Sequence, residues 1–234
     1  MSSAKITYAG HSAVFMELNG VKIGVDPWLQ GNPLCPPSLH KPASLDLIVL
    51  THGHSDHAGD TVRLATATGA AIAATYELAM IMVAEGVPSD KVIPMNKGGT
   101  VDFRGVSVHL THAFHSSSFD GSKGTVYAGE ACGVIIAAGE TTMYHAGDTE
   151  LFGDMKIIGE LHQPTVAMLP IGDRFTMGPA AAAQAAEWLQ CGLAIPIHYK
   201  TFGLLTGTYE EFARECDSRG VPHRELHPGD SIAV

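Results

Sequence analysis

Three imidazoles and a carboxylate fall close together in the segment Thr51-His52-Gly53-His54-Ser55-Asp56-His57. Neutral imidazole and carboxylate are donors that suit zinc, manganese and iron. His52 and His54 are two residues apart, so in extended backbone their side chains point the same way and can hold one ion. Asp56 and His57 lie past the turn and can reach a second ion close by. The spacing therefore predicts a metal site with two positions.

A buried strand is needed to position this segment. The largely apolar run over 45–50 predicts such a strand, and it ends directly at the histidines. Asn19-Gly20 between two alternating runs predicts a hairpin near the N-terminus. Further strands are predicted over 71–74, 92–95, 100–103, 106–111, 133–138, 141–144, 165–170 and 193–197. Helices are predicted over 60–68, 76–85, 154–161 and 179–190, and from a capping box at Thr208 to Gly220. These elements suggest two sheets packed face to face with helices outside, in a single domain over 1–234.

Composition and charge narrow the class of protein. The 234 residues are 45% hydrophobic and 16% charged, which is typical of a globular chain with a real core. There is no apolar run of membrane-spanning length and no secretory pattern at the N-terminus, so we expect a cytoplasmic protein with no membrane partner. The net charge of −10, without a basic cluster, disfavours nucleic acid. We expect a small-molecule substrate, and a homo-oligomer is left open.

The His52–His57 segment after an apolar strand resembles the H-x-H-x-D-H signature of the metallo-β-lactamase superfamily. Four further segments resemble the other motifs of that family in family order: Val25-Asp26-Pro27-Trp28, Ala113-Phe114-His115-Ser116-Ser117, His145-Ala146-Gly147-Asp148-Thr149 and Pro196-Ile197-His198-Tyr199. The resemblance covers most of the chain. It implies an α+β fold, namely a four-layer αββα sandwich with the metals at one edge.

Shorter segments resemble a subgroup of small metal-dependent hydrolases related to ascorbate-6-phosphate lactonase. They are Gly10-His11-Ser12, His115-Ser116-Ser117-Ser118, Leu169-Pro170-Ile171-Gly172, Thr176-Met177-Gly178-Pro179, and His198-Tyr199 with Thr201-Phe202. In this subgroup a second glycine often follows Leu-Pro-Ile-Gly. Here the residue is Asp173, which we expect to alter the rim of the pocket.

The resemblance also implies a ligand set for two divalent ions. One ion takes His52, His54 and His115, the other takes Asp56, His57 and His198, and Asp148 bridges them. We expect zinc ahead of manganese, with iron third. Two such ions can share a hydroxide whose pKa falls toward 7, and this metal-bound hydroxide, held with Asp56 and Asp148, is the expected nucleophile.

Two residues are expected to support the ligands. Asp26 is predicted to orient a ligating histidine from behind, and the alternative is a turn residue before Pro27. His112 competes with His115 for the third motif, but the His-Ser-Ser context favours His115. That leaves His112 either behind the ligands or as a polar residue at a strand end.

Three residues are candidates for substrate contact. His11 would border the site by resemblance, although a solvated loop histidine is an equal alternative. Arg174 and Lys200 are the cations near the late motifs, and either can hold an anionic group of a substrate. As lone surface charges they more often have no specific role.

These residues predict a dinuclear hydrolase that acts on a small ester, lactone or phosphodiester. One alternative is a mononuclear iron dioxygenase for persulfides, which needs only His52, His54, His115 and Asp148; the presence of His198 argues against it. A second alternative is a non-catalytic metal-binding protein, which every filled motif disfavours. An RNA-processing nuclease shares the signature but needs a basic surface or arm, and neither is evident.

Overall fold

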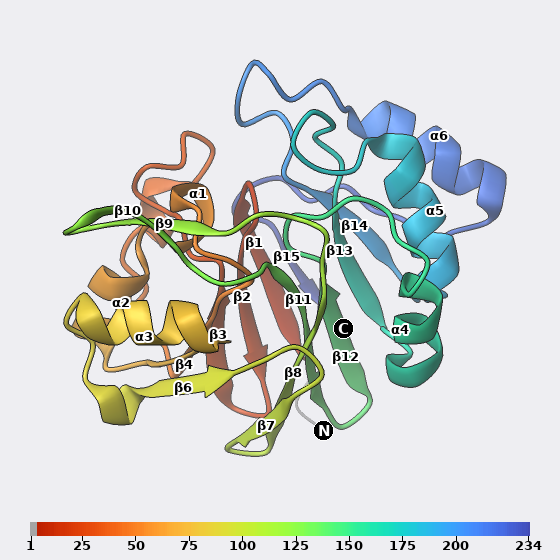
Figure 1. Ribbon diagram of the computed structural model, residues 1–234. Coiled ribbons are helices and arrows are strands. Elements are labelled where there is room, and N and C mark those ends of the chain that lie inside the picture. The colour runs from red at the N-terminus through yellow and green to blue at the C-terminus, as the bar shows by residue number, and fades with distance from the viewer. Residues whose placement is uncertain (1–3) are drawn as a thin grey trace.

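Two mixed β-sheets pack face to face in the computed structural model, which describes residues 4–234 (Figure 1). One sheet has the spatial order β15 (Ser231–Ala233), β1 (Lys5–Gly10), β2 (Ala13–Leu18), β3 (Val21–Val25), β4 (Leu47–Val49), β5 (Ala71–Thr75) and β6 (Val92–Met95). The other has the order β14 (Ala194–Ile197), β13 (Val166–Pro170), β12 (Thr141–His145), β11 (Cys132–Ala138), β8 (Val106–His112) and β7 (Thr100–Phe103). The short strands β9 (Ser118–Gly121) and β10 (Gly124–Tyr127) form a separate hairpin.

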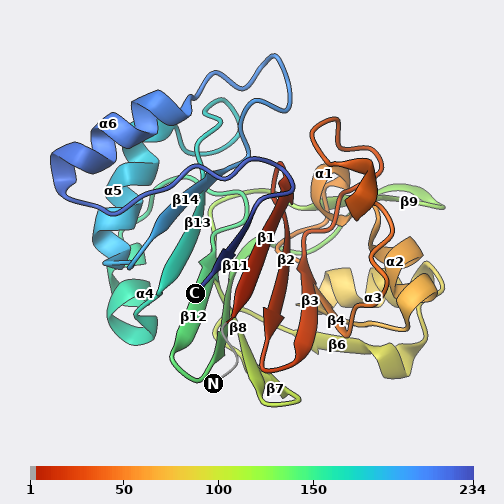
Figure 2. The same cartoon turned by 180° about the vertical axis from the view of Figure 1, so that it is seen from behind.

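Helices cover the outer face of each sheet, as Figure 2 shows from behind. The first sheet carries α1 (Ser55–Ala58), α2 (Thr61–Thr68) and α3 (Tyr76–Ala84), and the second carries α4 (Met155–His162), α5 (Pro179–Leu189) and α6 (Tyr209–Arg219). Short 3₁₀ turns lie at Pro37–Leu39 and Ser89–Lys91. Among the helices described, none combines the length and the apolar character that crossing a bilayer requires.

Three apolar clusters hold the four layers together. Val14, Leu47 and Val49 belong to the cluster between the sheets, whereas Ile48 belongs to the cluster beneath α2 and α3. A third cluster fills the space between the second sheet and its helices, and Phe212 of α6 is wholly buried in it. Strand β4 is thus covered on both faces, which explains why its sequence is a continuous apolar run instead of an alternating one. The predicted α+β sandwich of four layers is confirmed by this layering.

The topology sends five chain segments to one edge of the sandwich. Strands β3 and β4 are parallel neighbours, and so are β12, β13 and β14. Strand β8 runs in the direction of β12, because both are antiparallel to β11 between them. The loops that follow β3, β4, β8, β12 and β14 therefore leave at the carboxyl ends of their strands, where sites commonly form.

The structure departs from the predicted elements in two places near this edge. The short helix α1 lies ahead of the helix predicted over 60–68 and was not predicted; it forms because the carbonyl of His54 accepts from the backbone N–H groups of His57 and Ala58. Between the strands predicted over 106–111 and 133–138, the structure adds β9, which pairs with β10. Its Ser, Asp and Gly content lacks a strand signal, and the pairing comes from the hairpin itself.

Thr208 is the N-cap residue of α6, and its contribution to stability can be measured. Its hydroxyl oxygen accepts from the backbone N–H of Glu211, as the capping box predicts, and Gly220 ends the helix at φ 67°. Thr208→Ala is expected to lower the free energy of unfolding by about 1 kcal/mol, because one N–H loses its partner. Thr208→Ser is the control and should stay close to wild type. Urea unfolding of both variants measures the difference, and equal loss in both would contradict the capping role.

Candidate metal centre

The first group of donors lies where β4 ends and just after β8. Ligand atoms of His52, His54 and His115 all lie within 4.8 Å of one another. His52 Nε2 and His54 Nδ1 are 3.0 Å apart. His52 is fully buried, while His54 and His115 are partly open to solvent. Three imidazole nitrogens at this spacing match what one divalent ion takes from a protein.

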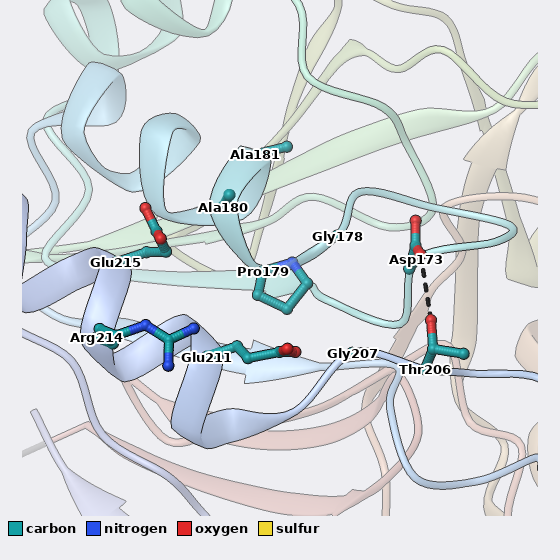
Figure 3. Close-up of a pocket in the computed structure, with 10 residues that line it drawn as sticks. All are labelled: Asp173, Gly178, Pro179, Ala180, Ala181, Thr206, Gly207, Glu211, Arg214 and Glu215. Atoms are coloured by element: carbon teal, nitrogen blue, oxygen red, sulfur yellow. Dashed lines mark hydrogen bonds between the residues drawn. The ribbon is translucent and has the colours of Figure 1, made fainter.

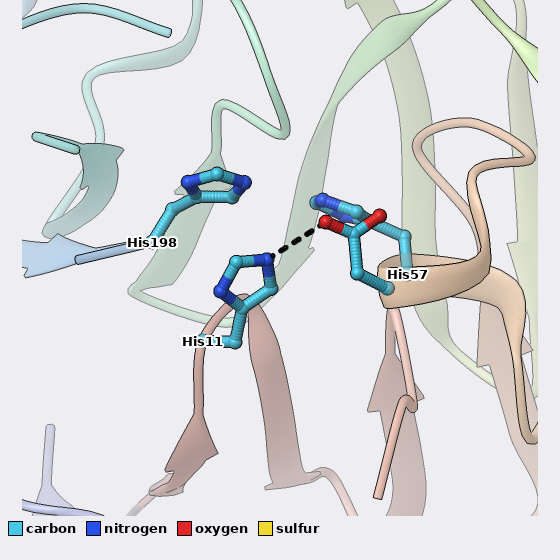
Figure 4. Close-up of side chains that lie close together, drawn as sticks. His11, His57 and His198 are labelled. Carbon is cyan, nitrogen blue, oxygen red and sulfur yellow. Dashed lines mark hydrogen bonds and ion pairs between the residues drawn. The ribbon is translucent and has the colours of Figure 1, made fainter. Parts of the chain in front are cut away.

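A second group combines three histidines and a carboxylate. Ligand atoms of His11, Asp56, His57 and His198 lie within 4.8 Å of one another. Asp56 and His57 are on the first turn of α1, and His198 directly follows β14. Figure 4 shows the rings of His11, His57 and His198 converging from three separate segments. The sequence placed three of these four residues in one ligand set and His11 outside it.

Asp148, in the loop after β12, lies between the two groups. Its Oδ1 is 3.2 Å from His57 Nε2, and its Oδ2 is 3.1 Å from His198 Nε2 and 3.6 Å from His115 Nε2. The side chain is nearly inaccessible to solvent. One carboxylate therefore faces histidines of both groups, which is the geometry a bridging ligand requires.

Unpartnered polar atoms show that these residues fit divalent metal ions. His57 Nε2, His198 Nε2 and Asp148 Oδ1 are buried, close to one another, and without a hydrogen-bond partner of proper geometry. Burying such atoms costs free energy unless something satisfies them. Because they are imidazole nitrogens and a carboxylate oxygen converging on one space, a cation is the group that satisfies all of them.

Asp26 supports the ligands from behind. Its Oδ2 accepts from His57 Nδ1 at 2.8 Å and from the Thr51 hydroxyl at 2.6 Å, and its Oδ1 accepts from the Thr51 N–H. The Thr51 oxygen lies 3.0 Å from His52 Nδ1 and is free to accept from it. With a metal ion bound, both histidines would keep their proton on Nδ1, so each would direct an Nε2 lone pair at the ion.

Close backbone approach and unusual dihedral angles shape the edge. Gly147 has φ 61°, and a Cβ there would lie 2.7 Å from Cβ of Thr51. His11, Asp26 and His198 also have positive φ, at 56°, 45° and 56°. Non-glycine residues in this region cost about 1 kcal/mol or more each and cluster at functional sites.

The pKa values of the donor residues are shifted in different directions by burial and by neighbouring charges. Burial opposes the charged form of His57, but Asp148 and Asp26 outweigh it and hold its pKa well above the usual range. Burial would raise the pKa of Asp148, yet His198 and His57 bring it well below its usual range. Burial, followed by the charge of His57, holds the pKa of His52 well below normal. Without metal, these shifts favour a charged His57 between Asp26 and Asp148 and a neutral His52.

The metal-free protein is expected to lose stability as the pH falls from about 7 to about 5. Burial and the charge of His198 lower the pKa of His11 to about 4. In the unfolded chain the same group titrates near 6.5. Acid therefore protonates the unfolded chain first, and His11 alone accounts for a loss of about 2 kcal/mol at pH 5.

The pKa shifts of three other buried histidines agree with a loss of stability at low pH. His52 and His145 also have lowered pKa values and add to the loss below about 6.5. His57 is charged in both states below about 6.5, so its contribution is constant there and declines only as the pH rises through its raised pKa. Urea unfolding of chelator-treated protein at the two pH values measures the difference. Equal stability at both would contradict the burial of neutral histidines.

Three residues predicted to take part lie elsewhere. His112 shares the inner face of β8 with Val108 and Leu110, where it lies 3.2 Å from Lys97 Nζ and packs against Phe114. His112 is thus a polar residue at the end of β8, which is one of the two predicted alternatives, and a role behind the ligands stays a prediction. Lys200 forms an ion pair with Glu225 at 3.0 Å, and Arg174 lies over the ring of Phe175. The contacts of both cations are therefore outside the ligand cluster.

Two residues with evident roles escaped the sequence analysis. Thr51 connects Asp26 to His52, and Thr201 lies 2.8 Å from His11 Nδ1 through its hydroxyl oxygen. Thr51 stands directly before the metal-binding segment, so its position was an available signal. Thr201 had only its place in the final motif, because its partner is near the other end of the chain.

A cavity of about 520 Å³ opens elsewhere, between the N-terminal end of α5 and one side of α6 (Figure 3). Its lining includes Asp173, Thr206 and Arg214, and the Thr206 hydroxyl donates to Asp173 at 3.1 Å. None of the donors described above lines it. We place the chemistry at the donor cluster, since size without convergent reactive groups does not define a site.

An αββα sandwich that gathers histidines and aspartates at one edge has the architecture of the metallo-β-lactamases. Residues 22–199 match the model of the beta-lactamase superfamily domain, and the chain belongs to this family. It is 45% identical over 231 residues to a UPF0173 metal-dependent hydrolase of Anoxybacillus flavithermus, an alignment that covers 98% of this chain and 100% of the relative. The protein is thus a metal-dependent hydrolase.

Solved structures agree with this assignment. The metallo hydrolase Igni18 of the archaeon Ignicoccus hospitalis is 36% identical, with a TM-score of 0.89 over 100% of this chain and 99% of the other. The metallo-beta-lactamase fold protein YhfI of Bacillus subtilis is 14% identical, with a TM-score of 0.77 over 100% of both chains. This second likeness shows the fold alone.

Proposed function

We propose that the protein is a dinuclear hydrolase that cleaves a small ester or lactone. The observation that carries the proposal is the place of Asp148, whose two oxygens face His57, His198 and His115 from both donor groups. When bound, two divalent ions supply a hydroxide of lowered pKa and polarise the group under attack. Zinc is the first expectation and manganese the second.

The surroundings favour an apolar substrate over a strongly anionic one. Phe202 is 37% exposed and packs edge-on against His11, with Trp28 5.9 Å from it between ring centroids. The two cations predicted to contact substrate, Lys200 and Arg174, are engaged with Glu225 and Phe175. An ester or lactone with an apolar portion therefore ranks ahead of a phosphodiester. The short motifs shared with lactonase relatives point the same way.

The protein's own groups have distinct tasks in this reaction. Asp26 and Thr51 hold His57 and His52 in one tautomer, so that both present a lone pair to the site. Asp56 and Asp148 concentrate negative charge where the cations bind. The net charge of −10 disfavours nucleic-acid substrates and so favours a small molecule.

Metal content per chain tests the proposal. The protein is purified without chelator and without a His tag, and zinc, manganese and iron are measured by elemental analysis. About two equivalents of zinc or manganese are expected, followed by hydrolysis in a screen of lactones, esters and phosphodiesters that Asp148→Asn fails to catalyse. One equivalent of iron would favour the persulfide dioxygenase instead. No metal after reconstitution would refute the site.

A further inference from the structure

His11 is held rigidly with its ring inside the donor cluster. It lies in the turn between β1 and β2, and its side chain is wholly buried. Its carbonyl accepts from the His198 N–H at 2.8 Å and from the Tyr8 hydroxyl at 3.0 Å. Its φ of 56° is a conformation that a bulky side chain rarely adopts. The fold thus maintains local strain in order to place this ring where it is.

The hydrogen bonds of His11 permit the tautomer that presents an Nε2 lone pair to the site. The Thr201 hydroxyl can donate to the carbonyl of Tyr199 at 3.3 Å, which leaves its oxygen able to accept from His11 Nδ1 at 2.8 Å. A ring with its proton on Nδ1 carries a lone pair on Nε2. That Nε2 lies 3.2 Å from Asp56 Oδ2, which is itself an acceptor. Two acceptors that face each other at this distance repel unless a cation lies between them.

The neighbours of His11 Nε2 are themselves metal donors. Ligand atoms of Asp56, His57 and His198 lie within 4.8 Å of one another and of the His11 donor. The rings of His11 and His198 are only 3.9 Å apart between centroids (Figure 4). Donor atoms that share one ion at bond lengths of about 2.0–2.2 Å lie about 3–4 Å apart. The separation of 3.2 Å between His11 and Asp56 falls in that range.

We propose that His11 is a direct ligand of the second metal position, binding through Nε2 together with Asp56, His57 and His198. The inference deepens the dinuclear function proposed above and rests on it. With Asp148 also present, this position has more donors than the four of a tetrahedral zinc site. The two positions then differ in coordination number, and the second suits an ion that accepts six ligands, such as Mn²⁺.

The test measures metal binding and ligation directly. Chelator-treated protein is titrated with Co²⁺ by calorimetry, and the loaded protein is examined by proton NMR for paramagnetically shifted imidazole N–H signals. His11→Asn removes the imidazole but tolerates the positive φ. It is expected to weaken the second binding event about 100-fold, to leave the first within about two-fold, and to lose one shifted N–H signal. Thr201→Val, which keeps Nε2, should weaken the second event about 10-fold or less while its signal persists.

The outcomes separate this inference from the proposed function. If His11→Asn binds both ions with wild-type affinity and keeps every shifted signal, then His11 only pairs with Asp56 and the inference is wrong. If the wild-type protein binds a single ion, the dinuclear function itself fails. Should His11→Asn not fold, a crystal structure of the metal-loaded wild type decides the matter. A distance of about 2.1 Å from Nε2 to the ion would support ligation, and one above about 3 Å would overturn it.

Discussion

Asp148→Asn is expected to release both metal ions together. The substitution removes the charge that faces His57, His198 and His115, while the size of the side chain is kept. Groups that merely stand behind ligands contribute 10–100-fold to affinity, so loss of a shared ligand should weaken both dissociation constants by roughly 100-fold or more. Elemental analysis and calorimetric titration measure this, with hydrolysis of any substrate found in the screen as a further readout.

Two matched variants make the Asp148 result specific. Asp56→Asn should mainly empty the second position, because Asp56 belongs to that donor group alone. Asp173→Asn, at an exposed aspartate outside the cluster, should bind both ions as the wild type does. Full occupancy and full activity in Asp148→Asn would show that Asp148 does not bridge.

The second large effect is expected from Asp26→Asn. The Asp26 carboxylate accepts three hydrogen bonds, from His57 Nδ1 and from the N–H and hydroxyl of Thr51. An amide can accept at one atom only, and its NH₂ group then faces a donor. We expect the free energy of unfolding of the metal-free protein to fall by about 3 kcal/mol, since a buried charged partner of His57 is lost. Metal affinity should weaken 10–100-fold, since His57 is no longer oriented.

The backbone makes asparagine the right replacement for Asp26. The residue has φ 45°, which asparagine tolerates and alanine does not, so the variant tests the carboxylate without added strain. Thr51→Val is the graded control, because it removes one of the three donors and should cost about 1 kcal/mol. Urea unfolding and metal titration are the measurements. Wild-type stability and affinity in Asp26→Asn would remove Asp26 from the support of the site.

Much of the fold could be predicted from local patterns in the sequence. The strand β4 and the capped helix α6 were readable because their signals are local: an apolar run in one case and a Thr208–Glu211 pair in the other. The hairpin of β9 and β10 was not, because Ser118, Asp120 and Gly121 of β9 give no strand signal and the pairing depends on the partner strand.

The residues of the candidate site also fall into those that local spacing predicts and those that only tertiary packing brings in. The segment that contains His52, His54 and His57 has a spacing that indicates metal binding by itself. His11 has no such spacing, and only the packing of the β1–β2 turn against the start of the loop after β14 brings it to His198. The two alternatives for His112 could not be separated for a related reason, since its neighbours depend on tertiary packing, which places it 3.2 Å from Lys97 Nζ.

The donors come from both sheets, with Asp56 and His57 from the first and Asp148 and His198 from the second. Bound ions would therefore cross-link the two sheets of the sandwich. Ions held in this way stabilise the folded state without guiding its formation. Refolding rates with and without metal should coincide in stopped-flow measurements, while unfolding should slow markedly when metal is bound. A metal-dependent refolding rate would show that the metal-binding edge of the sandwich forms early in folding. The effect of metal on the refolding rate therefore indicates when the two sheets come together.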